Sequence, residues 1–80
     1  MEVNVNLYGD VRKYGKKPAF ALRVPAGLAV GDVLDYLKLP PDVPLAIVVN
    51  GVHEDRRYRL SDADVLSLFS MSAFSEGERA

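Results

Sequence analysis

One stretch of this 80-residue chain has the periodicity of a helix, and the segments on both sides of it have the periodicity of strands. The apolar residues of that stretch recur at i, i+3, i+4 and i+7, which places them on one helical face. They are Val30, Val33, Leu34 and Leu37. The Pro40-Pro41 pair ends the helix, because the residue before a proline avoids the α region. A single amphipathic helix predicts a fold in which strands supply the surface that covers its apolar face.

The predicted helix has favourable charges in its first and last turns but a poor N-cap residue. Asp32 lies in the first turn and Lys38 in the last, where each charge favours the helix dipole. Ala29 occupies the N-cap position, and an alanine there forgoes about 1 kcal/mol of capping. We therefore expect a helix that begins at Val30 and includes Lys38.

Apolar and polar residues alternate in three further segments, residues 2–8, 19–24 and 65–69, and a period of two predicts half-buried strands. Residues 45–49 are apolar throughout, which favours a central strand covered on parts of both faces. The element order favours an α+β fold, a mixed four- to five-stranded sheet with one helix packed across one face.

The connections carry turn signals. Asn50-Gly51 is the strongest short-range hairpin signal in the chain, and Val52 would start the return strand. Residues 9–18 are expected to form a loop of about ten residues with glycines near both ends. Residues 61–64 predict a turn, and a short strand is expected around residues 58–60.

Residues 1–70 are thus expected to form one domain, and residues 71–80 lose all periodicity and are expected to form a flexible tail. The N-terminal segment has no basic and apolar regions of a secretory signal. The longest apolar run, Leu45–Val49, is far shorter than the roughly 20 residues that span a bilayer. A cytoplasmic protein without a membrane partner is the expectation.

The chain contains no cysteine, which excludes disulfides, cysteine-ligated zinc and a cysteine nucleophile. A domain of this size buries only about 60% of its unfolded surface, so a deep substrate cavity is hard to stabilise. The only histidine, His53, stands beside Glu54-Asp55 in a polar stretch and is expected to be solvent-exposed. Glycine-rich phosphate loops and nucleophile motifs are absent. We expect neither an enzyme nor a bound cofactor or metal.

The net charge of −1 gives no sign of a polyanionic partner. Two clusters are nevertheless basic, and each contains a tyrosine, a combination that can bind a nucleic-acid backbone. Exposed loops whose charges keep strand edges from pairing are the preferred interpretation, and nucleic-acid binding is not expected. The clusters are Arg12, Lys13, Lys16 and Lys17, and Arg56, Arg57 and Arg59.

The last strand predicts an interaction surface. If Leu66 and Leu68 face the helix, Val65 and Phe69 must face away from it, on the side that one helix cannot cover. Two further apolar residues, Met71 and Phe74, continue into the tail. An exposed apolar patch of this kind is typical of a protein interface, so these four residues are the candidate partner-binding residues. The alternative is that the tail folds back and buries Phe74 locally.

Three segments in register resemble the MoaD/ThiS sulfur carriers, a family of ubiquitin-like β-grasp proteins. The segments are VPAGLAVGDVL at residues 24–34, IVVNG at residues 47–51 and LSDADVLSLF at residues 60–69. The family's corresponding motifs are V-P-x-G-x-T-V-x-D-L-L, V-N-G and L-x-D-G-D-E-V-x-L-F-P-P. The resemblance covers residues 2–70 and implies the β-grasp fold. Ala29 replaces the family's capping threonine, and Ala63 replaces the glycine of its D-G-D turn.

The resemblance also implies a mode of action, in which an adenylating enzyme activates a C-terminal Gly-Gly that then carries sulfur for molybdopterin or thiamin synthesis. Here Phe74-Ser75 stand where the two glycines should come, and five residues follow. Bare backbone suits a narrow active-site channel, and a phenylalanine does not. The first hypothesis is therefore a non-conjugating interaction subunit, and a molybdenum/tungsten-pterin or sulfur-transfer complex is the expected assembly. The alternative is a sulfur carrier with an atypical or processed C-terminus, whose partners would be an adenylating enzyme and a pterin- or thiazole-synthase-type subunit.

Overall fold

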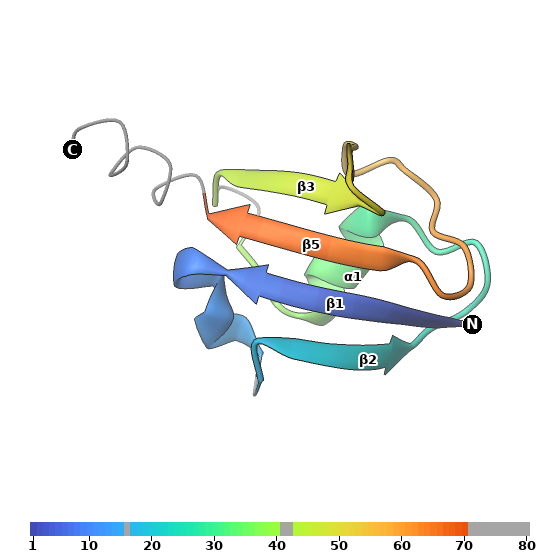
Figure 1. Ribbon diagram of the computed structural model, residues 1–80, viewed down its shortest axis with the longest axis horizontal. Coiled ribbons are helices and arrows are strands. Elements are labelled where there is room, and N and C mark those ends of the chain that lie inside the picture. The colour runs from blue at the N-terminus through green and yellow to red at the C-terminus, as the bar shows by residue number, and fades with distance from the viewer. Residues whose placement is uncertain (16, 41–42, 71–80) are drawn as a thin grey trace.

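The computed structural model describes residues 1–15, 17–40 and 43–70, which form a five-stranded mixed sheet with one helix on one face (Figure 1). This arrangement confirms the predicted α+β class. The elements are β1 (Glu2–Tyr8), the 3-10 helix η1 (Gly9–Tyr14), β2 (Ala19–Arg23), α1 (Val30–Tyr36), β3 (Leu45–Val49), β4 (Val52–His53) and β5 (Val65–Ser70).

The strand order in the sheet is β2-β1-β5-β3-β4. The first and last strands, β1 and β5, are parallel neighbours near the middle, and the remaining pairs are antiparallel. In Figure 1 the sheet lies in front of α1, so the viewer looks at the face that the helix does not cover. We call this the outer face and the helix-covered side the inner face.

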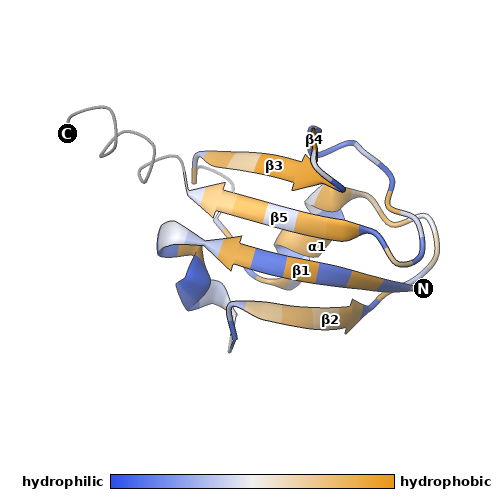
Figure 2. Cartoon of the chain, viewed as in Figure 1, coloured by the Kyte–Doolittle hydropathy of each residue, from blue (hydrophilic) through white to orange (hydrophobic). Residues whose placement is uncertain are grey.

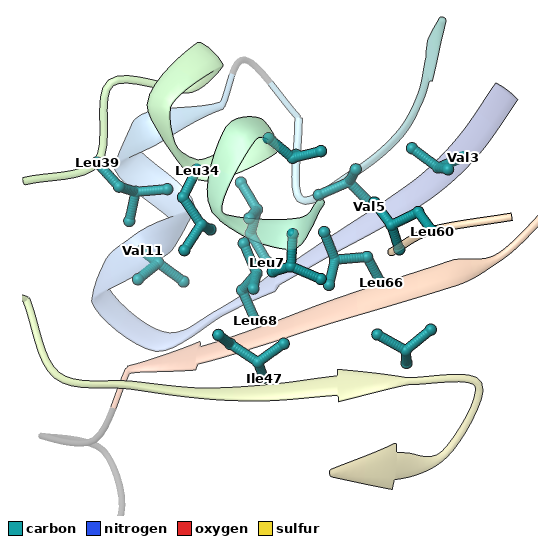
Figure 3. Packing of buried hydrophobic residues seen from close by; sticks show 13 residues of the cluster. Val3, Val5, Leu7, Val11, Leu34, Leu39, Ile47, Leu60, Leu66 and Leu68 are labelled. Carbon is teal, nitrogen blue, oxygen red and sulfur yellow. The ribbon is translucent and has the colours of Figure 1, made fainter. Parts of the chain in front are cut away.

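The core lies between the inner face and α1, and the alternation in the sequence explains its composition. Every second residue of β1 and β5 is buried, and β1 shows the alternating hydropathy in Figure 2. Figure 3 shows Leu34 of the helix and Leu66 and Leu68 of β5 together in this layer. The buried apolar residues are Val3, Val5, Leu7, Val11, Val30, Val33, Leu34, Leu39, Ile47, Val49, Leu60, Leu66 and Leu68.

The helix is shorter than its charge pattern predicts, and the assignment of Lys38 to its last turn is wrong. Helix α1 ends at Tyr36, and Lys38 follows with a φ of 61°. The N–H of Lys38 donates to the carbonyl of Asp35, and the N–H of Leu39 donates to the carbonyl of Leu34, each at 3.0 Å. This pair of bonds is a Schellman motif, normally built on a glycine. Because Leu39 is buried beside the core, its burial fixes the helix end.

The N-terminus of α1 follows the prediction. Ala29 is the N-cap and forms no side-chain cap, while the carboxylate of Asp32 accepts the N–H of Ala29 at 3.1 Å.

Upstream, the predicted loop of residues 9–18 contains the 3-10 helix η1, which the sequence prediction missed. The spacing of Val11 and Tyr14, three residues apart, was the available signal, since Val11 is buried and Tyr14 packs against the core.

The expected strand at residues 58–60 is reduced to a single bridge between Ala29 and Arg59. The neighbouring backbone bonds run from Val30 N–H to Tyr58 and from Leu60 N–H to Leu28, so this segment holds the start of the helix. The other predicted connections are confirmed, namely the Asn50-Gly51 hairpin turn and the turn at residues 61–64.

Candidate interaction surface

The outer face of the sheet is the strongest candidate site, and its residues follow from the register of the strands. Tyr8 pairs with Phe69, which pairs with Ala46, so these three side chains form one row across β1, β5 and β3. The next row joins Ala19, Asn6, Ser67, Val48 and His53, and the third joins Ala21, Asn4 and Val65.

Two aromatic rings dominate the first row. The rings of Tyr8 and Phe69 are stacked, with centroids 4.5 Å apart and an angle of 8° between their planes. Tyr8 is 45% exposed and Phe69 is half-buried. Stacking fixes both rings on the surface, which lowers the entropy that a partner would have to remove on binding.

The charges lie at the margins of this face. Glu2 and Arg23 are paired in register at one end of β1 and β2. His53, on the short strand β4, is exposed and lies at the opposite edge. Among the strand residues between those margins, all of which are described, the outer-face side chains are uncharged. Such a surface is typical of the centre of a protein interface, where charged residues are depleted and aromatic residues enriched.

The structure places two of the four predicted partner-binding residues on this face. Val65 is 36% exposed, and Phe69 faces the same side, while Leu66 and Leu68 are fully buried beneath them. Met71 and Phe74 lie outside the described residues. Prediction from the sequence missed Tyr8, although the alternation along β1 puts Tyr8 on the same face as Asn4 and Asn6.

The turn at residues 61–64 secures the start of β5 and so positions this face. The Asp64 carboxylate accepts the Ser61 N–H at 2.7 Å and the Asn50 side-chain N–H at 2.8 Å, and Asp64 is only 7% exposed. Asn50 in turn accepts the Val65 N–H through its side-chain oxygen at 2.8 Å. One carboxylate therefore links the hairpin turn to the last strand.

The other chemically suggestive residues whose contacts the structure describes make exposed, pairwise interactions. Arg57 forms an exposed ion pair with Asp55 at 3.4 Å, and the N–H of Arg57 lowers the pKa of the Asp55 carboxyl. Arg59 donates to the carbonyl of Gly27 at 3.0 Å. Within the described ranges, no group of three or more metal-ligating side chains comes together. No helix in that same part of the chain is long and apolar enough to cross a membrane.

Comparisons with known proteins find likeness in structure alone, since no family model and no curated protein matches the chain. SAMP1 from Haloferax volcanii aligns with a TM-score of 0.72 at 20% identity, covering 88% of this chain and 94% of that one. A putative molybdopterin converting factor subunit 1 from Pyrococcus furiosus aligns with a TM-score of 0.73 at 21% identity, covering 88% and 97%.

A third match is the complex of subunits 1 and 2 of molybdopterin-converting factor from Helicobacter pylori 26695. It aligns with a TM-score of 0.61 at 22% identity, covering 88% of this chain and 93% of that one. All three neighbours match almost over their full length, so the likeness extends over the whole fold. This chain therefore has the ubiquitin-like β-grasp fold of the MoaD-like and small archaeal modifier proteins, as its sequence motifs predict.

Proposed function

We propose that this protein is a MoaD/ThiS-like, non-conjugating interaction subunit that binds a larger protein through the outer face of its sheet. The single observation that carries the proposal is the exposed ring of Tyr8, stacked on the half-buried ring of Phe69, on a face whose charges lie only at its margins. The partner would be a subunit of a molybdenum/tungsten-pterin or sulfur-transfer complex.

A partner that docks on the outer face gains contact with aromatic rings and loses little hydration of charged groups. Aromatic rings held in the centre of a flat surface are the residues that most often carry binding energy. Ala46, Val48 and Val65 around them are small and apolar, so a partner can approach without removing charges from water. The H. pylori neighbour is a complex of two converting-factor subunits, which supports a partner of the synthase type.

The tail supports the non-conjugating form of the proposal. Where the family motif leads to two glycines, the sequence has Phe74-Ser75. A phenylalanine would have to enter a channel that accepts bare backbone, which is sterically unfavourable.

The second candidate function is a sulfur carrier with an atypical or processed C-terminus. The observation that favours it is the fold itself, because the structural neighbours include a putative molybdopterin converting factor subunit 1 and small archaeal modifier protein 1 (SAMP1). The chain would then also bind an adenylating enzyme.

Intact mass spectrometry separates the two candidates. The protein is incubated with an adenylating enzyme, ATP and a sulfur donor, and its mass is then measured. We expect no change in mass. A gain equal to the replacement of a terminal OH by SH, on the full or a trimmed chain, would establish the carrier function and reject the non-conjugating one.

Binding to a synthase-type subunit tests the surface directly. We expect Tyr8→Glu and Phe69→Asp each to weaken binding by about thirtyfold or more, because central aromatic residues typically contribute at least 2 kcal/mol. Tyr36→Glu is the matched control, since Tyr36 is 66% exposed but belongs to the helix on the other side of the sheet. Equal binding by all three variants would exclude the outer face as the interface.

A further inference from the structure

A second surface lies on the inner side of the sheet, where the edge of β2 meets the end of α1. It is a groove of about 420 Å³. Its walls are mostly rings and aliphatic chains, from Tyr14, Phe20, Leu22, Tyr36 and Leu37. Gly15 and Lys17 complete the lining, and Lys17 is its charged residue. Tyr36 is 66% exposed, which makes it the most exposed large apolar or aromatic side chain in the described part of the chain.

The backbone beside this groove has one side that pairs with no other described strand. Val24 and Met1 exchange two hydrogen bonds, at 2.8 and 2.9 Å, and the Leu7 N–H donates to the Pro18 carbonyl at 2.7 Å. In an antiparallel pair, hydrogen-bonded residues recur every second position, so Phe20 and Leu22 also bond to β1. The N–H and C=O groups of Ala19, Ala21 and Arg23 therefore point away from the sheet, and β2 is its outermost strand.

The two edges of the sheet differ in what they offer a partner. The opposite edge strand, β4, has only two residues, and very short edge strands resist pairing. Strand β2 has five residues, and two of them, its first residue Ala19 and its middle residue Ala21, carry small uncharged side chains. Edge strands are usually protected by charge or proline, and here Pro18 and Arg23 provide that protection only at the two ends.

We propose that this edge binds an extended peptide of a partner protein, which adds to β2 as a sixth strand. Alternate residues of an added strand point to the same side, so apolar residues at every second position would enter the groove. Antiparallel addition places the C-terminal end of the peptide beside Lys17, at the start of β2. The peptide is therefore apolar at alternate positions and acidic at its C-terminal end.

Charge selects this occupant over a second copy of the chain. The Lys13 ammonium lies 5.4 Å from the centre of the Tyr14 ring, so a second cation stands at the Lys17 end of the groove. Antiparallel pairing of two β2 strands would bring Lys17 of one chain towards Arg23 of the other, and like charges oppose such pairing. An acidic peptide end meets the same cations favourably.

The test uses the full chain and a synthetic probe, the capped peptide Thr-Val-Thr-Ile-Thr-Val-Asp-Asp. Amide NMR with hydrogen exchange follows its binding. Strand addition requires that the amides of Ala19, Ala21 and Arg23 exchange fast in the free chain and slowly in the complex. The amides of Phe20 and Leu22 are protected in both states. A control peptide with lysines in place of the aspartates should bind at least about tenfold more weakly, since like charges then face each other.

Two variants locate the contact. Ala21→Pro removes one outward N–H, a change that edge strands tolerate, and should weaken peptide binding by about tenfold or more. Tyr36→Glu puts a negative charge into the groove and should also weaken peptide binding by about tenfold or more, although Tyr36 belongs to the helix and not to the sheet. Tyr8→Glu, on the outer face, should leave peptide binding unchanged, so failure of this proposal is distinguishable from failure of the proposed function.

Four results would overturn the proposal. The first is no binding of the probe at millimolar concentration, and the second is a binding response confined to Tyr8, Val65 and Phe69. The third is protection of the Ala19 and Ala21 amides in the free chain at all concentrations, which would mean that residues of this chain already occupy the edge. The fourth is protection that grows with protein concentration, which would identify a second copy as the occupant.

Discussion

Ala63 holds the turn before β5 in a backbone conformation that alanine disfavours, and replacing it by glycine should stabilise the fold. Its φ is 68°, in the left-handed region. The conformation is imposed by the turn, since the Ala63 N–H donates to the Glu2 carbonyl at 2.7 Å and the Asp64 N–H donates to the Ser61 carbonyl at 3.1 Å. The side chain itself is exposed, so its removal costs little packing.

The expected magnitude is a difference between two effects. A residue with a Cβ in the left-handed region costs roughly 1–2 kcal/mol, which glycine avoids. Glycine in turn makes the unfolded chain more flexible, which costs about 0.4–1 kcal/mol. Ala63→Gly should therefore raise the free energy of unfolding by about 0.8 kcal/mol. For a domain of this size, that corresponds to an increase in Tm of about 4 °C.

Urea unfolding, with Ala26→Gly as the control, measures this difference. Ala26 is also exposed and also lies in a turn, but its φ is outside the left-handed region. The free energy of unfolding of the Ala26→Gly control should fall by about 0.4–1 kcal/mol, because only the flexibility of the unfolded chain changes. If both variants lose the same amount of stability, the native turn is not strained at Ala63, and the reasoning is refuted.

Three further substitutions test other parts of the fold by the same unfolding measurement. Lys38→Gly should raise the free energy of unfolding by about 0.5–1 kcal/mol, because glycine is the favoured residue at this helix end; a loss would contradict the motif. Gly15→Ala should lower it by about 1–2 kcal/mol, since the new Cβ would lie 2.7 Å from a methyl group of Leu7; a gain would show that the loop can shift. Asp64→Ala should lower it by about 3 kcal/mol, because the Ser61 N–H and the Asn50 amide each lose an ionised acceptor; a loss under 1 kcal/mol would mean that water replaces it.

The strands and the inner face could be predicted because burial in a sheet repeats every two residues. In β1, every second residue is buried, namely Val3, Val5 and Leu7. The same alternation in β5 placed Val65 and Phe69 on the face opposite to that of Leu66 and Leu68. The resemblance to MoaD/ThiS proteins added the topology, which periodicity alone cannot give. Pairing of β1 with β5 joins the two ends of the domain, and no local pattern encodes such a long-range contact.

The errors occurred where tertiary contacts override local preference. Lys38 has good helix propensity and a favourable charge for the last turn, yet the helix ends two residues before it, at Tyr36, because the burial of Leu39 requires the chain to turn at Lys38. Tyr8 was not singled out because a tyrosine at the end of an alternating strand is unremarkable. Its importance comes from Phe69, which lies 61 positions away in the chain and beside it in the sheet.

The two proposed surfaces use opposite sides of the sheet, and this separation has a consequence that can be measured. Tyr8 belongs to the outer face and Tyr36 to the groove under the β2 edge. Substitutions without shared contacts add in their free-energy effects to within about 0.5 kcal/mol. The double variant of Tyr8→Glu and Tyr36→Glu should therefore bind the synthase-type subunit as weakly as Tyr8→Glu alone does. It should bind the peptide as weakly as Tyr36→Glu alone does. Coupling above that limit would show that one partner covers both surfaces, so that the face and the groove form one continuous interface.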